Sequence, residues 1–425
     1  MAIFLFFVSL GLFLIIRIPL AFAMGLSSLI FLLCKGNIPL LIIVQKAFAG
    51  TDSFPMLALP LFIYAGAIMN VGGIAKRLID CASALVGHIR GGLAMVNIVA
   101  SMFFGGISGS AVADTSALGS VLIPGMVKKG YKPDFSAAVT AASATIGIII
   151  PPSIAMILYA VVSEASVGEL FIAGMVPGIL VGLSQMVIAY IISVRKNYPV
   201  EGQFSVRQTL KAIKKGFWAL IMPVIILGSI IGGVCTPTES AGIAVIYGMI
   251  VSVFIYRSMS WKRLWEATYQ TVVTTATIMI IIGFGALVGW ILSYSRIPVQ
   301  LAEFILSIST TRWVILLMID AFLILLGTFM HGTPIILVVI PILLPLVQRL
   351  DVSLVHFGMI VIFNIGIGQQ TPPLGTCLFV TSALANLDIL EVARADIPFI
   401  ILMIGLLLLI TYVPVISLFF PSLLM

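Results

Sequence analysis

Charge is scarce in this sequence. Only 9% of its 425 residues are charged, whereas 61% are hydrophobic. Soluble domains carry about 25% charged residues, so this composition excludes a water-soluble protein. The apolar runs repeatedly reach membrane-spanning length, and none alternates in polarity as the strands of an outer-membrane barrel do. The chain is therefore predicted to be an all-α protein that crosses the lipid bilayer many times.

Cysteine and histidine are also rare, with 4 and 3 residues. The four cysteines have neither paired nor metal-ligand spacing, which argues against a disulfide framework or a zinc site. The net charge is +7, but the basic residues lie in short segments between apolar runs. That distribution orients a membrane protein, so no nucleic-acid partner is expected.

Two polar, glycine-rich segments, 105–116 and 327–334, interrupt the apolar sequence. Glycine and proline residues recur at the same spacing in and after each of these segments. A shift of 221 positions relates Gly106 to Gly327, Gly147 to Gly368, and the Pro-Pro pair 151–152 to the pair 372–373. Agreement over about seventy positions indicates two copies of one structural unit.

Each copy is predicted to contain scaffold spans, a re-entrant helical hairpin and a helix broken at its Pro-Pro pair. The predicted order is a first repeat 1–193 with hairpin 91–127 and broken helix 134–163, a basic cytoplasmic linker 194–215, and a second repeat 216–425 with hairpin 312–348 and broken helix 357–386. The other predicted spans are 2–16, 18–34, 54–72, 169–193, 216–233, 238–256, 270–293 and 397–421, with an interfacial helix at 74–84. Five crossings precede the linker, so the second repeat is expected to be inverted.

The basic residues test this topology. With the 194–215 linker in the cytoplasm, 17 lysines and arginines fall inside and 5 fall outside. This bias follows the positive-inside rule and predicts that both termini are periplasmic.

The four irregular points are where a transport site is expected. Irregular backbone persists within hydrocarbon only where protein or a water-filled cavity covers it. In inverted-repeat transporters such points meet near the midplane, where helix N-termini face anions and freed carbonyls coordinate cations. Candidate sodium ligands are the oxygens of Ser108, Gly109, Ser110, Gly147, Gly327, His331, Thr333 and Thr371. Candidate substrate-binding residues are Ser108, Asp114, Thr145, Pro151, Asn364, Gln369, Gln370, Pro372 and Gly375.

Some of these features have simpler explanations. Glycine and serine in membrane helices often serve close packing, and a Pro-Pro pair is often a kink. Asp114 is either a site residue or a cap of the second hairpin arm, and Asp320 and Glu239 are either proton sites or local polar contacts. His331 is expected at a hairpin tip, whereas His88 and His356 are expected in loops at the membrane surface.

The sequence resembles the large membrane subunit, of DctM type, of tripartite ATP-independent periplasmic (TRAP) transporters. The resemblance covers nearly the whole chain and is carried by residues 106–110 with 113–115, 147–153, 236–239 and 371–375. It implies a bacterial inner-membrane secondary transporter that uses a sodium gradient to import an organic acid such as a C4-dicarboxylate, a sialic acid or a sugar acid.

The same resemblance implies partners and a mechanism. A periplasmic binding protein would deliver the substrate, and a small four-helix membrane subunit would be a separate chain, because this sequence contains no such extra segment. The implied fold moves the hairpins and broken helices against a scaffold in an elevator motion. Sodium ions are the only expected cofactors, as coupling ions.

Two alternatives remain open at this point. One is a self-sufficient anion or dicarboxylate permease of the same wider architecture. The other is an intramembrane enzyme that uses Asp114 with Asp320 for acid–base work. Because the shift of 221 relates Asp114 to Ile335, the repeat does not favour the enzyme.

Overall fold

The computed structural model describes residues 1–200, 202 and 204–424. These residues form helices joined by short connections and include no strand, which confirms the all-α prediction. Within this part of the chain, eight helices are long and apolar enough to cross a membrane, or nine if the bent pair Pro133–Ile149 and Ile154–Ser163 is one span.

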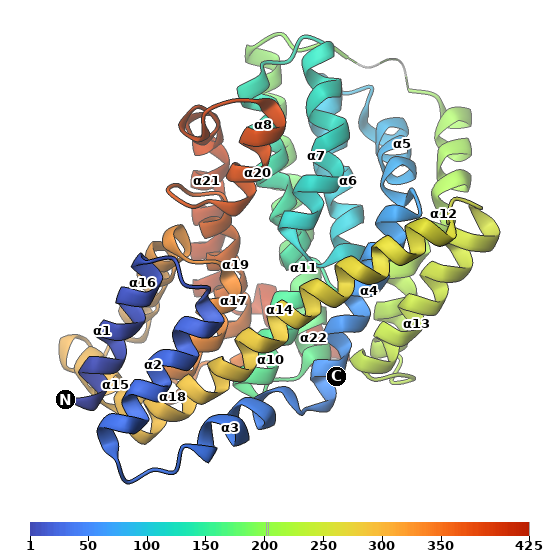
Figure 1. Ribbon diagram of the computed structural model, residues 1–425. Coiled ribbons are helices and arrows are strands. Elements are labelled where there is room, and N and C mark those ends of the chain that lie inside the picture. The colour runs from blue at the N-terminus through green and yellow to red at the C-terminus, as the bar shows by residue number, and fades with distance from the viewer. Residues whose placement is uncertain (201, 203, 425) are drawn as a thin grey trace.

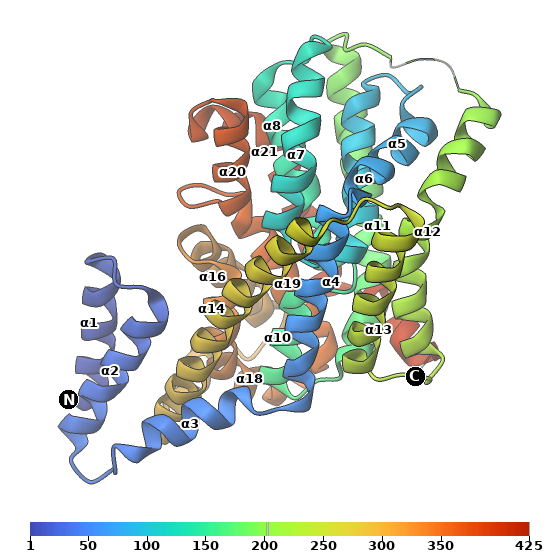
Figure 2. The same cartoon turned by 45° about the vertical axis from the view of Figure 1, so that its right-hand side comes forward.

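The N-terminal segment forms a helical arm followed by the first long span. Its elements are α1 (Ala2–Ile15), α2 (Leu20–Lys35), α3 (Leu41–Thr51), the 3-10 turn η1 (Phe54–Leu57), α4 (Ala58–Val71) and α5 (Ile74–Val86). In Figure 2, α1 and α2 stand apart from the main body, and α3 leads from them toward α4.

A hairpin and a broken helix come next. The elements are α6 (Gly92–Ser108) and α7 (Ala111–Lys128), then α8 (Pro133–Ala144), α9 (Ile146–Ile149) and α10 (Ile154–Ser163), and finally α11 (Val167–Arg195). The chain reverses between α6 and α7 at two residues, Gly109 and Ser110. The break between α9 and α10 contains the Pro151-Pro152 pair, whose peptide bond is cis.

The second half has a similar order of elements. They are α12 (Val206–Ile231), α13 (Pro237–Ile250) with the π-helical turn η2 (Val251–Ile255), α14 (Trp261–Tyr294), α15 (Ile297–Ile308), α16 (Arg312–Phe329), α17 (Gly332–Pro334), the π-helical turn η3 (Ile335–Val339), α18 (Ile340–Arg349), α19 (Leu354–Gln369), α20 (Thr376–Ala385), α21 (Ile389–Tyr412) and α22 (Val415–Leu424). The second break, between α19 and α20, also contains a cis Pro-Pro bond, at Pro372-Pro373.

Helix α14 is the longest element and joins the arm to the body. Its 34 residues extend about 51 Å at 1.5 Å per residue, well beyond a hydrocarbon core of roughly 30 Å, so it must tilt if it crosses a bilayer. Figure 1 shows it running obliquely across the molecule. Near its C-terminal end, Leu287 and Ile291 form a small separate core with Phe6 and Phe31 of the arm.

Serine side chains set the start of several helices. Ser110, Ser153 and Ser166 each accept a hydrogen bond from the backbone N–H three residues later, at the N-termini of α7, α10 and α11. At α13, Thr236 and Glu239 form a reciprocal capping box, which satisfies orphan backbone donors. Glu239 is thus engaged as a local cap, with its Oε2 accepting from the Thr236 N–H at 2.8 Å.

Three boundaries differ from the sequence prediction. Helix α12 begins at Val206, so the second half of the predicted 194–215 linker is helical. Ser205 caps this helix. Its first turns mix basic and apolar residues, and this composition is why the segment was predicted to be a basic loop. The predicted span 397–421 divides into α21 and α22 at Val413, where Pro414 follows, and α15 forms where no helix was predicted.

The prediction for His356 was wrong. This side chain is buried within α19 rather than lying in a surface loop. Its Nδ1 lies 2.8 Å from the Ser417 Oγ, and its Nε2 lies 3.3 Å from the Thr411 carbonyl oxygen. The partners of His356 lie more than fifty residues later in the sequence, on α21 and α22. The contacts therefore depend on the packing of α19 against these helices, which the sequence around His356 does not show.

Candidate functional site

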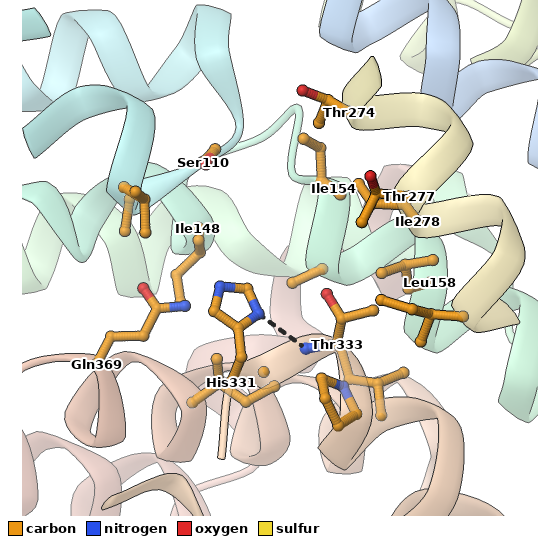
Figure 3. A pocket seen from close by; sticks show the side chains of 18 of the residues that line it. Ser110, Ile148, Ile154, Leu158, Thr274, Thr277, Ile278, His331, Thr333 and Gln369 are labelled. Atoms are coloured by element: carbon orange, nitrogen blue, oxygen red, sulfur yellow. Dashed lines mark hydrogen bonds between the residues drawn. The ribbon is translucent and has the colours of Figure 1, made fainter. Parts of the chain in front are cut away.

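The two hairpin tips, distant in sequence, line one cavity of about 550 Å³. The first tip contributes Gly109 and Ser110, and the second contributes His331 and Thr333. Gln369, at the end of the broken helix α19, completes the set of candidate residues that reach this cavity. Figure 3 shows Ser110, His331, Thr333 and Gln369 around the pocket, with α14 on the facing side.

The first tip is built by a glycine and a helix cap. Gly109 has φ +63°, a left-handed conformation that ends α6 and that glycine adopts without strain. The Gly109 carbonyl accepts a hydrogen bond from the Ile154 N–H at 3.2 Å, which ties the tip to the start of α10. Ser110 then caps α7, and Ala111 and Val112 of its first turn line the cavity.

Asp114 is buried behind this tip. Its Oδ1 accepts a hydrogen bond from the Ser108 hydroxyl. Its Oδ2 has no hydrogen-bond partner among the described residues and lies against the Cα of Gly147, where an added Cβ would overlap it. A buried carboxylate oxygen is costly unless a proton or cation satisfies it. Asp114 does not cap α7, because Ser110 has that role.

The second tip repeats the close contacts of the first. Gly327 and Gly368 approach so closely that a Cβ on Gly327 would lie 3.0 Å from the Gly368 Cα. In the first half, a Cβ on Gly105 would lie 2.7 Å from the Gly147 Cα. The break after α19 is tied back to the hairpin by the Leu374 N–H, which donates to the Thr328 carbonyl at 3.1 Å.

Other candidates lie outside the large cavity, although several are close to it. Ser108 lines a neighbouring space of about 170 Å³, together with Ser110. Pro151 lines a separate cavity between α6, α11 and α12. The remaining candidates are absent from the lining of the large cavity: Asp114, Thr145, Gly147, Gly327, Asn364, Gln370, Thr371, Pro372 and Gly375.

Asn364 belongs to a different polar network. Its Nδ2 donates to the Asp320 Oδ1 at 2.9 Å, and the Thr411 hydroxyl donates to the other oxygen of Asp320, also at 2.9 Å. All three residues are buried, so both carboxylate oxygens of Asp320 are satisfied by neighbouring helices. Asp114 and Asp320 thus belong to separate networks.

The sequence reasoning missed three polar residues, of which two line the large cavity. Thr274 and Thr277 of α14 line the large cavity opposite the hairpin tips. Their spacing of three residues within an apolar helix places both hydroxyls on one face, which is a signal that could have been used. Asp396 of α21 was also missed: it is fully buried, and neither of its carboxylate oxygens has a partner in the described part of the chain.

These features can be compared with known proteins. A family profile for the tripartite ATP-independent periplasmic transporter, DctM component, matches residues 7–416. The chain belongs to the DctM family of TRAP transporters. It is therefore a polytopic membrane protein of a transporter family and not an enzyme.

Three relatives of this TRAP permease illustrate the range of names in the family. The chain is 40% identical to an isethionate TRAP transporter permease protein DctMQ of Oleidesulfovibrio alaskensis, over 97% of this chain and 65% of that protein. It is 39% identical to a C4-dicarboxylate TRAP transporter large permease protein of Pseudomonas aeruginosa, over 94% of each chain. It is also 36% identical to a sialic acid TRAP transporter large permease protein of Vibrio cholerae, over 95% of each.

A solved structure supports the fold. The crystal structure of the Alcanivorax borkumensis YdaH transporter, described as having an unusual topology, matches with a TM-score of 0.61 over 89% of each chain. At 16% sequence identity, this similarity concerns the fold alone.

Proposed function

We propose that this TRAP permease is the large membrane subunit of a sodium-gradient-driven importer of a small organic acid. The observation that carries the proposal is that both hairpin tips line one cavity, so that two polar backbone reversals in an apolar protein meet. Such meeting points are where transporters of this architecture bind substrate and coupling ions.

The proposed cation sites lie at the two hairpins. In the first, the proposed ligands are the oxygens of Ser108, Gly109, Ser110 and Gly147, and the support is Asp114, which bonds to Ser108 and whose Oδ2 is buried and unpartnered in the described structure. Oxygen ligands and a buried negative charge fit a hard cation such as sodium. In the second hairpin, the corresponding ligands are the oxygens of Gly327, His331, Thr333 and Thr371.

The proposed substrate site is the cavity between them. Ser110, Gln369 and the α7 N-terminus supply polar contacts for an anion, and the partial positive charge of a helix N-terminus adds to them. Residues of the breaks and of the helices behind the tips would complete the site or move with it: Ser108, Asp114, Thr145, Pro151, Asn364, Gln370, Pro372 and Gly375.

The architecture proposed for transport has two inverted repeats, 1–193 and 216–425, joined by 194–215. Each half has a close glycine contact between its hairpin and its broken helix, Gly105 with Gly147 and Gly327 with Gly368, although Gly105 lies one position before Gly106, the equivalent of Gly327. The hairpins and broken helices would move as one body in an elevator motion against a scaffold that includes α4 with α13 and α14, which both pack against it.

The proposed partners and location follow from family membership. A periplasmic binding protein would deliver the substrate, and a small four-helix membrane subunit would bind the scaffold. The protein would lie in the bacterial inner membrane with both termini periplasmic.

Uptake into proteoliposomes tests the proposal. Radiolabelled isethionate, succinate and N-acetylneuraminate would be offered with and without an inward sodium gradient, to the chain with both partners and to the chain alone. Sodium-driven uptake that requires both partners is the expected result. Uptake by the chain alone would instead support a self-sufficient permease, and sodium-independent uptake would refute the coupling.

A further inference from the structure

The chemistry of the cavity lining restricts the substrate. Most of the lining is aliphatic, and within the described part of the chain no lysine, arginine, aspartate or glutamate contributes to it. The polar side chains are limited to Ser110, Thr274, Thr277, His331, Thr333 and Gln369. His331 is thus the one ionisable side chain among the described lining residues, so no fixed cationic side chain is available to an anion.

The orientation of His331 is set by its neighbour. The Thr333 N–H donates to the His331 Nδ1 at 3.4 Å, and Figure 3 draws this bond. An imidazole nitrogen that accepts carries no proton, so the proton of the neutral ring lies on Nε2. The imidazole therefore offers an N–H donor on the edge away from Thr333. The Nε2–H group of His331 can therefore donate to an anion, while the backbone carbonyl of His331 is the oxygen that the proposed cation site uses.

Gln369 supplies a second donor on the same side. Its Oε1 accepts from the Cys377 thiol at 3.7 Å, which leaves the Nε2 amide group to face the cavity. In Figure 3 the amide nitrogen of Gln369 points toward the imidazole of His331. Two N–H donors therefore face one cavity, which the first turn of α7 also lines.

This arrangement suits one anionic head. A second carboxylate on the same substrate would leave water without a cationic side chain to pair with, so only the partial charge of the α7 N-terminus or a coupling sodium ion would offset the cost of its desolvation. Hydroxyl groups along the substrate could bond only to Ser110, Thr274, Thr277 or Thr333, and elsewhere they would meet aliphatic side chains such as Ile148, Ile154 and Leu158. Each unmatched hydroxyl lowers affinity by roughly 5- to 150-fold.

We propose that this cavity takes an organic monoanion, with a single carboxylate or sulfonate head and a mainly apolar body, and that the N–H groups of His331 and Gln369 bind the head. This inference rests on the proposed function, and it selects among the substrate classes that the family name leaves open. Dianions and polyhydroxylated sugar acids are the classes that it disfavours.

Two matched pairs of anions test the substrate class. Monomethyl succinate and succinate share a carbon skeleton and differ by one charge, and hexanoate and gluconate share six carbons and differ in hydroxyl content. Each would be added, at equal sodium concentration, to the purified complex of both membrane subunits without the binding protein. Thermal stabilisation then reports the affinity of the membrane site, because a ligand of the folded state raises stability by RT ln(1 + [L]/Kd).

The expected result is that monomethyl succinate and hexanoate bind at least tenfold more tightly than succinate and gluconate. Binding of succinate or gluconate as tightly as its matched partner, or more tightly, would overturn the inference, as would binding of none of the four. Sodium-driven uptake of a dianion would refute this substrate class while leaving the proposed transport function intact, whereas loss of sodium coupling would refute that function.

Variants test the two donors. His331→Leu removes the N–H and should raise the Kd for hexanoate roughly tenfold or more, because hydrogen bonds to charged groups are among the strong ones. His331→Gln keeps an N–H donor and should retain most of the affinity, and Gln369→Glu should lose it through repulsion. His88→Leu, at an exposed histidine beside Phe204, is the matched control and should leave the Kd unchanged. An unchanged Kd in His331→Leu and Gln369→Glu would refute the assignment.

Discussion

Gly368→Ala is the sharpest test of the packing that shapes the second hairpin. A Cβ on Gly368 would lie 2.6 Å from the Cα of Gly327 and 2.7 Å from its carbonyl carbon and oxygen. Ordinary contact begins near 3.4 Å, so α16 and α19 would have to separate by about 3.4 − 2.6 = 0.8 Å. The obstructing atoms belong to the backbone, and no side-chain rotation can relieve the overlap.

The change in stability caused by Gly368→Ala is the sum of two opposing effects. Overpacking of a well-packed interior typically costs about 1–3 kcal/mol. Replacing a helical glycine by alanine returns up to about 1 kcal/mol through helix propensity. With the full offset, Gly368→Ala should therefore destabilise the protein by up to about 2 kcal/mol.

Gly366→Ala is the matched control on the same helix. Gly366 is also buried, but the nearest atom to its added Cβ would be the Ile148 Cδ1 at 3.6 Å, an ordinary contact distance. This variant should be neutral or stabilised by up to about 1 kcal/mol.

Thermal unfolding of the purified membrane complex, at one scan rate because unfolding of such proteins is often irreversible, measures the difference. The expected order of melting temperatures is Gly366→Ala at or above the native protein and Gly368→Ala below it. Sodium should also protect Gly368→Ala less, because the Gly327 carbonyl is a proposed cation ligand. Equal melting temperatures for the two variants, or a lower one for Gly366→Ala, would refute the close-contact argument.

Three further predictions concern the site, its support and the topology. Ser110→Ala and Thr333→Ala should each raise the sodium concentration for half-maximal uptake without reducing the amount of inserted protein; unchanged sodium dependence in both would count against the proposed cation sites. Thr411→Val removes one hydrogen bond to the Asp320 carboxylate and should cost about 1.5–3 kcal/mol in thermal stability, with little change in substrate KM, since this network does not line the cavity. A cysteine at the exposed position Gln208, in a background with the exposed native thiol replaced, should react with an impermeant maleimide only from the cytoplasmic side; labelling from outside would contradict the proposed orientation.

The class of the fold was predictable because the bilayer imposes strong constraints on composition. With so few charges, the chain can bury its backbone polar groups in lipid only through helices, and the apolar runs give their approximate positions. Boundaries were less predictable where a helix leaves the apolar region. Helix α12 begins in the basic segment at Val206, and a serine cap rather than hydrophobicity decides that start.

The candidate site was predictable only in part. Ser110, His331, Thr333 and Gln369 stand out in the sequence as polar residues at interruptions of apolar runs, and the structure brings them to one cavity. The same signal also selected Asn364, which instead bonds to Asp320 and Thr411 within the helical packing. A polar residue in a membrane helix needs a partner in either case, so its identity alone does not reveal whether that partner is a ligand or another helix.

The sequence by itself determined the all-helical membrane fold and the family. Composition forces backbone hydrogen bonds into helices, and the glycine and proline positions mark where those helices must break. Tertiary structure alone decided which breaks share a cavity, that α14 covers it with Thr274 and Thr277, and that Asp114 rather than Asp320 keeps an unpartnered oxygen. Those outcomes depend on helices that are distant in the chain approaching one another, and the close approach is possible because the facing glycines carry no Cβ.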